Sequence, residues 1–491
     1  MTHTGPSGAT AVAASARTPY ARDVEAARVR FRRALTLLLM TLVLPGSAQL
    51  VLGRRAVGRA AVRVWLGCWA VLLLTVAVGV LDRGFVFWAG LNPGLLGALR
   101  LLLCALAIGW VLLFLDAWRL GEPLQLRQKQ RLVVVGLNGA FTFLVAGALL
   151  FGSHLVAVHR DLVLAVSGDG DASAAQDGRY NVLLVGGDSG VGRYGLRTDS
   201  LTVASIDADT GRTVLFGLPR NMTDFPFPEG SVLGEAFPDG YDCETCTLNS
   251  LATWAADNPD RFAGTADPGM AATIEGVEGI TGLPVNYYAM VDLDGFRSLV
   301  AAMGGLTLNV RDRIPIGLPV RRYIEPGVRE LDGFETLWFA RSRESADDYS
   351  RMARQKCVMS AMLQQLSPQV VITRFAALAE AGEHILTTDL PASELDTFAE
   401  LALKAKAQRI STVSFVPPVI STSSPDIAKV HAMVATAVER AEGDGGGGGG
   451  GRSRPSQGFD ARSAGPSTGG SIGSMSEGYR ANQADDLSKA C

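Results

Sequence analysis

Four long apolar stretches fill the first third of the chain, and they restrict its fold more than any other feature of the sequence. They cover residues 34–53, 64–81, 98–115 and 132–152. Each is close to the roughly 20 residues that a helix needs to cross a bilayer core of ~30 Å. None resembles a cleavable signal peptide, because the first stretch begins late and further apolar stretches follow it. The sequence therefore predicts a helical membrane region over residues 34–152.

Arginines on both sides of the first stretch bear on how many of the four stretches cross. Basic residues mark the cytoplasmic side of a membrane, and here they stand before and directly after the stretch: Arg17, Arg22, Arg28, Arg30, Arg32, Arg33, then Arg54, Arg55, Arg59 and Arg63. Pro45 and Gly46 also interrupt the stretch. This pattern favours a re-entrant or interfacial hairpin. The alternative is a true first span, with the amino terminus outside.

The other three stretches are then expected to cross, at about 64–81, 98–115 and 132–152, which places the chain after about residue 152 outside the cytoplasm. We expect a multi-pass protein of the cell membrane, with a basic cytoplasmic segment at 1–33, a linker at 153–178 and a soluble domain at 179–440. A tail rich in glycine and serine, 441–491, is predicted to be disordered. The chain has a net charge of −3 and no dominant basic stripe, so no nucleic-acid partner is expected.

Short β-rich segments alternate with helical patterns from Tyr180 onward. Such interleaving predicts an α/β fold with a central sheet covered by helices on both faces. The predicted strands are 181–185, 200–206, 213–218 and 410–416, and the predicted helices are 249–256, 270–281, 293–303, 350–366, 370–381 and 392–407.

A polar residue stands at one end of each of the first three predicted strands: after the first strand, at the start of the second and after the third. If these strands run antiparallel, Asp188, Asp199 and Arg220 lie at the same edge of the sheet. Two neighbouring carboxylates suit a Mg²⁺ ion, which takes one or two carboxylates and completes its shell with phosphate and water. The alternative is that these acids are solvated turn residues with arginines as surface partners.

A second group of basic residues follows later in the chain. Arg341 and Arg343 end an apolar run and would point the same way if that run is extended. Arg351 and Gln355 lie one turn apart on the predicted helix 350–366, and a charged helix face accounts for Arg354. Because guanidinium groups bind phosphate in a bidentate way, the sequence predicts a site for a polyphosphate.

These segments together resemble the LytR-CpsA-Psr (LCP) family of cell-envelope glycopolymer transferases, over residues 180–416. The anchor of several helices is similar to that of actinobacterial members. The matching segments are Gly186-Gly187-Asp188-Ser189, Arg197-x-Asp199, Pro219-Arg220, Tyr287-Tyr288, Asp294-Gly295-Phe296, the run from Gly304 to Val310, Leu331-Asp332-Gly333, Arg341-x-Arg343 and Asp348-x-x-Arg351-x-x-x-Gln355.

The resemblance implies an α-β-α sandwich with a mixed central sheet, and a membrane-anchored phosphotransferase. Such an enzyme moves a glycan phosphate from a polyprenyl diphosphate carrier onto peptidoglycan, next to the membrane lipid. By position, Asp188 and Asp199 would hold Mg²⁺ and act in catalysis with Arg220. The residues that would bind the diphosphate are Arg197, Arg220, Arg341, Arg343, Arg351 and Gln355.

One departure from the family pattern and two other functions stay open at this point. The family has an acid directly after the Pro-Arg pair, where this chain has Asn221. The same residues would also serve a hydrolase that cleaves the lipid diphosphate with water. A non-catalytic regulator of the envelope is the other alternative.

Cys243 and Cys246 form a Cys-x-x-Cys sequence in a long predicted loop. Zinc needs about four ligands, and no second pair of cysteines or nearby histidine accompanies these two. Outside the cytoplasm, a local disulfide is the favoured interpretation. A redox-active pair is the alternative.

Overall fold

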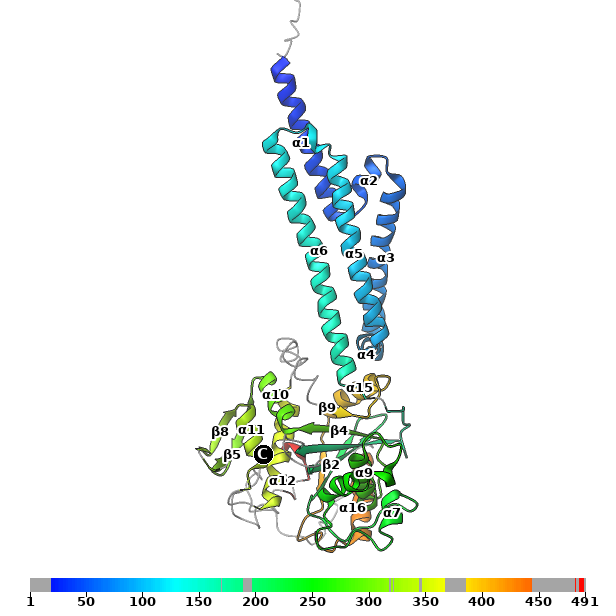
Figure 1. Cartoon of the computed structure of the whole chain (residues 1–491), viewed down its shortest axis with the longest axis vertical. Helices are drawn as coiled ribbons and strands as arrows, with labels where there is room; N and C mark the ends of the chain where they lie inside the picture. Colours follow the sequence, from blue (N-terminus) through cyan, green and yellow to red (C-terminus); the bar gives the residue numbers. More distant parts are fainter. Residues whose placement is uncertain are drawn as a thin grey trace, which may run out of the picture. The chain divides into compact units, whose positions relative to one another are not determined.

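The chain forms two compact units in a computed structural model (Figure 1). One unit contains the amino-terminal helices up to Ala157, and the other contains residues 87–93 and the chain from Val158 onward. The structure describes residues 19–168, 170–188, 197–317, 319–320, 322–343, 347–366, 386–443, 482 and 485–489.

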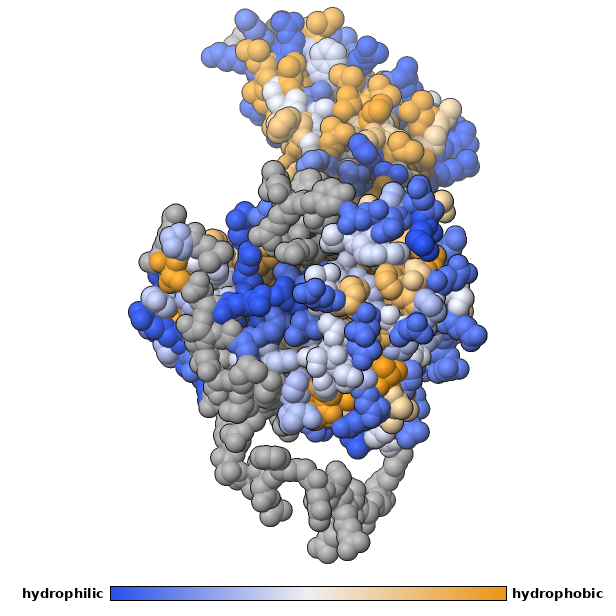
Figure 2. Space-filling model, turned by 60° about the horizontal axis from the view of Figure 1, so that its bottom comes forward, coloured by the Kyte–Doolittle hydropathy of each residue, from blue (hydrophilic) through white to orange (hydrophobic). Residues whose placement is uncertain are grey.

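The first unit is helical, and three of its helices are long and apolar enough to cross a membrane among the residues described. These three are α3 (Arg55–Leu81), α5 (Pro93–Leu120) and α6 (Gln128–Ala165). They contain the second, third and fourth apolar stretches. Shorter helices stand between them, α4 (Arg83–Leu91) and η1 (Pro123–Gln125). α3 exposes a series of large apolar side chains, and Figure 2 shows apolar residues gathered on this unit with hydrophilic residues around them.

The first apolar stretch is broken in its middle. α1 (Pro19–Val43) ends just before Pro45, and α2 (Ser47–Val51) begins after Gly46. Gly46 has a positive φ of 90°, and a Cβ there would come within 2.6 Å of the Gly58 carbonyl oxygen. Only glycine tolerates this conformation and this close approach. The break agrees with the interruption seen in the sequence, and re-entry into the membrane stays a prediction.

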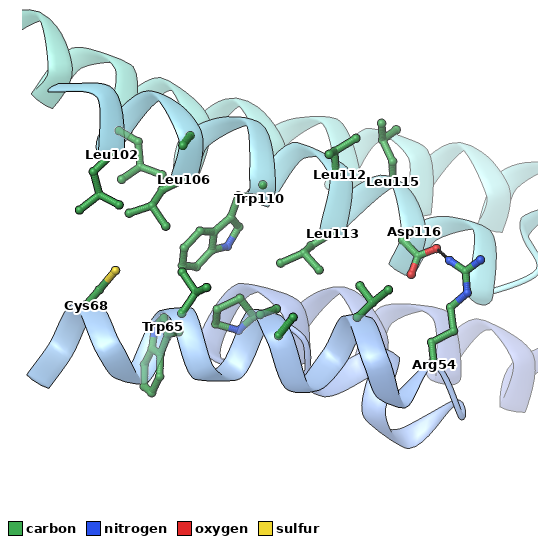
Figure 3. A pocket seen from close by; sticks show the side chains of 18 of the residues that line it. Arg54, Trp65, Cys68, Leu102, Leu106, Trp110, Leu112, Leu113, Leu115 and Asp116 are labelled. Carbon is green, nitrogen blue, oxygen red and sulfur yellow. Dashed lines mark hydrogen bonds and ion pairs between the residues drawn. The ribbon is translucent and has the colours of Figure 1, made fainter. Parts of the chain in front are cut away.

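A largely apolar pocket of about 910 Å³ lies between α3 and α5 (Figure 3). Leucines and the rings of Trp65 and Trp110 line it, and an ion pair between Arg54 and Asp116 stands at one end. The ion pair compensates the only carboxylate in the lining, Asp116, which would be costly to leave unpaired beside apolar side chains.

The second unit is built on a six-stranded mixed sheet, which confirms the predicted α/β fold. Its order is β10-β3-β2-β1-β4-β9. β1 pairs antiparallel with β2, and β2 with β3, as expected for the three strands that have polar residues at one end. β4 lies parallel to β1 and β10 parallel to β3. The strands are β1 (Arg179–Asp188), β2 (Arg197–Asp207), β3 (Thr213–Leu218), β4 (Tyr287–Asp292), β9 (Leu386–Thr388) and β10 (Ser411–Ser414).

Helices and two small hairpins surround this sheet. The helices are α7 (Val232–Ala236), α8 (Leu251–Asp257), α9 (Pro268–Thr281), α10 (Leu293–Met303), α11 (Gly333–Arg341), α12 (Asp348–Gln365), α15 (Leu395–Lys406) and α16 (Ile427–Gly443), with short turns η2 (Leu248–Ser250), η3 (Pro259–Phe262) and η4 (Leu487–Lys489). The hairpins pair β5 (Leu306–Val310) with β8 (Gly327–Leu331), and β6 (Ile314–Ile316) with β7 (Arg322–Ile324). The predicted helix 370–381 lies outside the described residues.

Alternate residues of each strand pack on opposite faces of the sheet, because successive side chains point to opposite sides. Val203 and Phe216 belong to the large core that includes residues of α9 and α16. Their neighbours Ala204 and Leu215 pack with Met359 of α12. Helices therefore cover both faces, and α12 lies on the face opposite α9 and α16.

Two parts of the sequence fold differently from their predictions. The run that ends at Arg341 is the helix α11 and not a strand, because Asp332 caps it by accepting a hydrogen bond from the Glu335 backbone nitrogen at 2.7 Å. A short apolar run does not distinguish a strand from a buried helix. Within the predicted disordered tail, Asn482 and Leu487 are buried. They differ because they contact the folded domain, which composition alone does not reveal.

The loop between α7 and η2 holds the Cys-x-x-Cys pair. The sulfurs of Cys243 and Cys246 are bonded to each other, with their Cα atoms 4.8 Å apart. Cys246 is buried in the large core beside Tyr241 and Leu248. The bond thus closes a short turn at the margin of that core.

Burial of Lys356 on α12 gives a testable pH dependence. Desolvation lowers its pKa from the usual 10.5 to about 8. Between pH 8 and 10.5 the unfolded lysine keeps a proton that the folded one releases, so stability rises with pH over this window. We expect the free energy of unfolding, relative to Lys356→Met, to increase by about 2 kcal/mol from pH 7.5 to 9.5. Urea unfolding of both proteins in detergent at each pH measures this difference, and a difference that does not change with pH contradicts the prediction.

Candidate active site

Three strand ends bring polar residues to one edge of the sheet. The last residue of β1, Asp188, pairs with the first residue of β2, Arg197, and a register shift falls between Gly186 and Gly187. Asp199 lies two residues further along β2, and Arg220 follows the end of β3 by two residues. The predicted placement at a shared edge is therefore correct for the backbone. The side chains of Asp188 and Arg197 lie outside what the structure describes.

Arg220 links the sheet edge to the start of α12. Its Nη1 donates a hydrogen bond to Oδ1 of Asp199, and its Nε lies 3.3 Å from Oδ1 of Asp348. The guanidinium of Arg220 and the carboxylate of Asp348 are largely buried, and the carboxylate of Asp199 is partly exposed. One arginine thus joins residues that lie more than 100 positions apart in the sequence.

Asp348 is the carboxylate on which the arginines converge. Its Oδ1 lies 3.1 Å from Nη2 of Arg351 and 3.8 Å from Nε of Arg343, in addition to the contact with Arg220. Asp348 is the first residue of α12, and the preceding Asp347 caps the helix by accepting from the Ser350 nitrogen at 2.6 Å. The sequence placed Asp348 in a matching segment but gave it no role. Its position three residues before Arg351, on the same helix face, was the available signal.

The cluster of Arg220, Arg343 and Arg351 with Asp199 and Asp348 has an excess of positive charge. Arg351 is the most enclosed member, with only 3% of its side chain exposed. Burial lowers the pKa of the Arg351 guanidinium below its ordinary value, and Asp348 and Asp199 oppose that shift. Its Nε has no hydrogen-bond acceptor among the described residues. Three guanidiniums against two carboxylates favour an additional anion, and a phosphate suits them because arginine binds it with several donors.

Arg354 stabilises the segment that precedes α12. The charged-face interpretation is wrong because its side chain is fully buried and its Nη2 donates to the carbonyl oxygen of Ser342. Desolvation lowers its pKa to about 10. Since Ser342 stands between Arg341 and Arg343, this hydrogen bond fixes the segment that carries both arginines.

The other candidate residues lie around the cluster. The Arg341 guanidinium is 5.4 Å from the ring centroid of Trp338 at the end of α11. Gln355 follows Arg351 by one turn of α12 and is half-buried. Asn221 is exposed beside Arg220. Of the six predicted diphosphate ligands, the structure brings Arg220, Arg343 and Arg351 together around one carboxylate.

The chemistry of the donors is compatible with Mg²⁺ at this edge. Among the described residues, no three His, Cys, Asp or Glu side chains gather as a metal cage. Asp199 offers a partly exposed carboxylate, 30% accessible, on the strand beside the end of β1. Mg²⁺ accepts as few as one or two carboxylates when substrate phosphates supply further oxygens. The site thus fits a metal bound together with a phosphorylated substrate.

We expect Asp348→Asn to destabilise the protein by about 3 kcal/mol, because it leaves the buried Arg351 without its closest carboxylate. Added inorganic pyrophosphate should restore part of this loss by replacing the missing negative charge. The matched control is Asp294→Asn, which breaks the exposed pair with Arg297 and should cost no more than about 0.5 kcal/mol. Urea unfolding in detergent measures both. Equal, small losses would show that Asp348 does not hold the cluster.

Comparison with known proteins shows which family this chain is similar to. A sequence model of the LytR_cpsA_psr family matches residues 156–433. Two Bacillus subtilis proteins named polyisoprenyl-teichoic acid–peptidoglycan teichoic acid transferase are similar. TagV is 26% identical over 152 residues, 30% of this chain and 39% of TagV. TagU is 24% identical over 266 residues, 53% of this chain and 74% of TagU.

The probable cell wall biosynthesis protein LcpB of Corynebacterium glutamicum is 27% identical over 251 residues, 50% of this chain and 52% of LcpB. The chain therefore matches less than two thirds of the length of TagV and LcpB. The crystal structure of B. subtilis TagV aligns with a TM-score of 0.40 at 22% identity, over 54% of this chain and 98% of that one. Because the family match covers more than half of its residues, the chain belongs to the LytR_cpsA_psr family.

Proposed function

We propose that this protein is a membrane-anchored phosphotransferase that attaches a glycan to peptidoglycan from a polyprenyl diphosphate carrier. The observation that carries the proposal is the convergence of Arg220, Arg343 and Arg351 on Asp348 beside Asp199. Named activities of the relatives TagV and TagU supply the class of donor and acceptor.

The proposed reaction breaks a phosphoanhydride bond of the carrier and forms a phosphate ester bond to peptidoglycan. A hydroxyl of peptidoglycan attacks the phosphorus that bears the glycan, and its proton passes to water. The bond from that phosphorus to the bridging oxygen breaks, and polyprenyl phosphate leaves. Negative charge increases on the departing phosphate, where Arg220, Arg343 and Arg351 stabilise it without having to reorganise. Arg197, Arg341 and Gln355 complete the proposed contacts with the diphosphate.

Asp188 and Asp199 are the residues that we propose hold Mg²⁺, at the ends of the adjacent strands β1 and β2. When bound, the ion would supply positive charge to phosphate oxygens. Asp199 contributes independently of it, because its hydrogen bond with Arg220 sets the direction of that guanidinium. Asn221 stands where relatives have an acid, so we assign no proton transfer to that position.

The three long apolar helices support a membrane anchor. The distribution of arginines around them supports an orientation in which the catalytic unit lies outside the cytoplasm. That side of the membrane holds peptidoglycan, so carrier lipid and acceptor would both be within reach.

We expect Arg220→Ala to lower the rate of glycan attachment by about 100-fold or more, since it removes a donor to the developing charge. Full-length protein in detergent, a polyprenyl diphosphate-linked glycan and peptidoglycan are combined, and radiolabelled glycan on peptidoglycan is counted. Arg297→Ala, on the exposed surface of α10, is the control. Release of free glycan phosphate without attachment would favour the hydrolase. Neither product, with the lipid still bound, would favour the non-catalytic regulator.

A metal-ion prediction follows from the two strand-end aspartates. EDTA should abolish transfer, and added Mg²⁺ should restore it. Asp199→Asn should raise the Mg²⁺ concentration required for half-maximal rate by about tenfold or more, because it removes one of two proposed ligand carboxylates. Titration of the transfer rate with Mg²⁺ measures this. A normal rate in EDTA would refute the metal requirement while leaving the arginine site standing.

A further inference from the structure

The last described residues of the chain dock on the outer edge of the sheet. β10 is an edge strand, and an edge strand exposes unpaired backbone groups. Residues 485–487 cover it as a short antiparallel addition. The Thr412 nitrogen donates to the Asp485 carbonyl at 3.1 Å, and the Leu487 nitrogen donates to the Ile410 carbonyl at 3.0 Å. We call Asn482 and residues 485–489 together the C-terminal clip.

Side chains hold the C-terminal clip against the domain as well. Leu487 is buried with Leu215 of the sheet and Met359 of α12. Arg409 pairs with Asp485 at 3.3 Å and with Asp486 at 3.0 Å. A buried apolar residue with ion pairs at its edge is typical of a specific interface, which has an apolar core and a polar rim.

Asn482 connects the C-terminal clip directly to the helix that carries the site. Its Nδ2 donates to the Tyr349 carbonyl at 2.6 Å, and its own carbonyl accepts from Nζ of Lys356 at 3.1 Å. Tyr349 and Lys356 are seven residues apart, which is about two turns of α12 on one face. Asn482, a single buried residue of the C-terminal clip, therefore forms hydrogen bonds with two turns of α12.

We propose that Asn482 is a positioning residue, through which the C-terminal clip fixes the first turn of α12 and the arginine cluster on it. Tyr349 follows Asp348 directly and stands two residues before Arg351. The first turn of a helix frays because its backbone N–H groups lack intrahelical partners. The bond from Asn482 restrains this turn from outside the helix, so the clip determines how closely Asp348 and Arg351 keep their positions. The inference rests on the proposed phosphate-binding role of that cluster.

The test compares two asparagines whose side-chain amides both donate a hydrogen bond to a helix carbonyl. Asn482→Ala removes the bond to Tyr349, and Asn258→Ala removes a bond of 2.8 Å to Trp254 on α8. Affinity for inorganic pyrophosphate is measured by calorimetry on the full chain in detergent. Asn482→Ala should weaken binding by about threefold to tenfold, and Asn258→Ala should leave it unchanged. Equal loss of stability in both variants with unchanged affinity in both would overturn the proposal.

A hydrogen-exchange measurement tests the role of the C-terminal clip independently of the proposed function. In Asn482→Ala, amides of residues 348–354 should exchange at least threefold faster than in the wild type, and in Asn258→Ala they should not. If the wild type binds no pyrophosphate, the proposed diphosphate site fails, and this exchange measurement alone decides on the clip. Unchanged exchange at 348–354 would refute it.

Discussion

The contact of Asp348 with three arginines is the interaction on which the proposed site depends. Guanidinium groups repel one another, and Arg220, Arg343 and Arg351 approach closely only because Asp348 lies among them. They come from three different segments: the end of β3, the residues after α11 and the first turns of α12. The carboxylate therefore ties the sheet edge to the start of α12, and it leaves an excess of positive charge for an anionic substrate.

Much of the surrounding fold serves to hold that first turn of α12. Asp347 caps the first turn of α12, and Arg354 fixes the preceding segment through a hydrogen bond to Ser342. Asn482 of the C-terminal clip donates a hydrogen bond to the first turn. These groups are buried or partly buried, so each hydrogen bond also satisfies a polar group that would be costly to leave unpaired. Restraint from several sides suits a site whose proposed task is electrostatic, because fixed charges stabilise a developing charge without reorganisation.

Local pattern was enough to predict the three strands β1, β2 and β3 that lead to the candidate site. β1, β2 and β3 have an apolar, β-rich composition, and their short connections make an antiparallel arrangement natural, which brings Asp199 and Arg220 to one edge. α11 was predicted incorrectly because nine residues with several apolar side chains suit a strand as well as a buried helix. The burial of Arg354 could not be inferred, since a charged residue on a helix is exposed far more often than not.

By itself, the sequence determined the long apolar helices, the break at Pro45 and Gly46, the α/β class and the polar residues at the strand ends. These depend on apolar length, backbone conformation and periodicity, which are properties of neighbouring residues. Three features appear only in the tertiary structure. Asp348 lies among the arginines, Arg354 is buried, and Asn482 contacts α12. Those contacts join residues up to 133 positions apart, and no local pattern encodes which distant segments pack together.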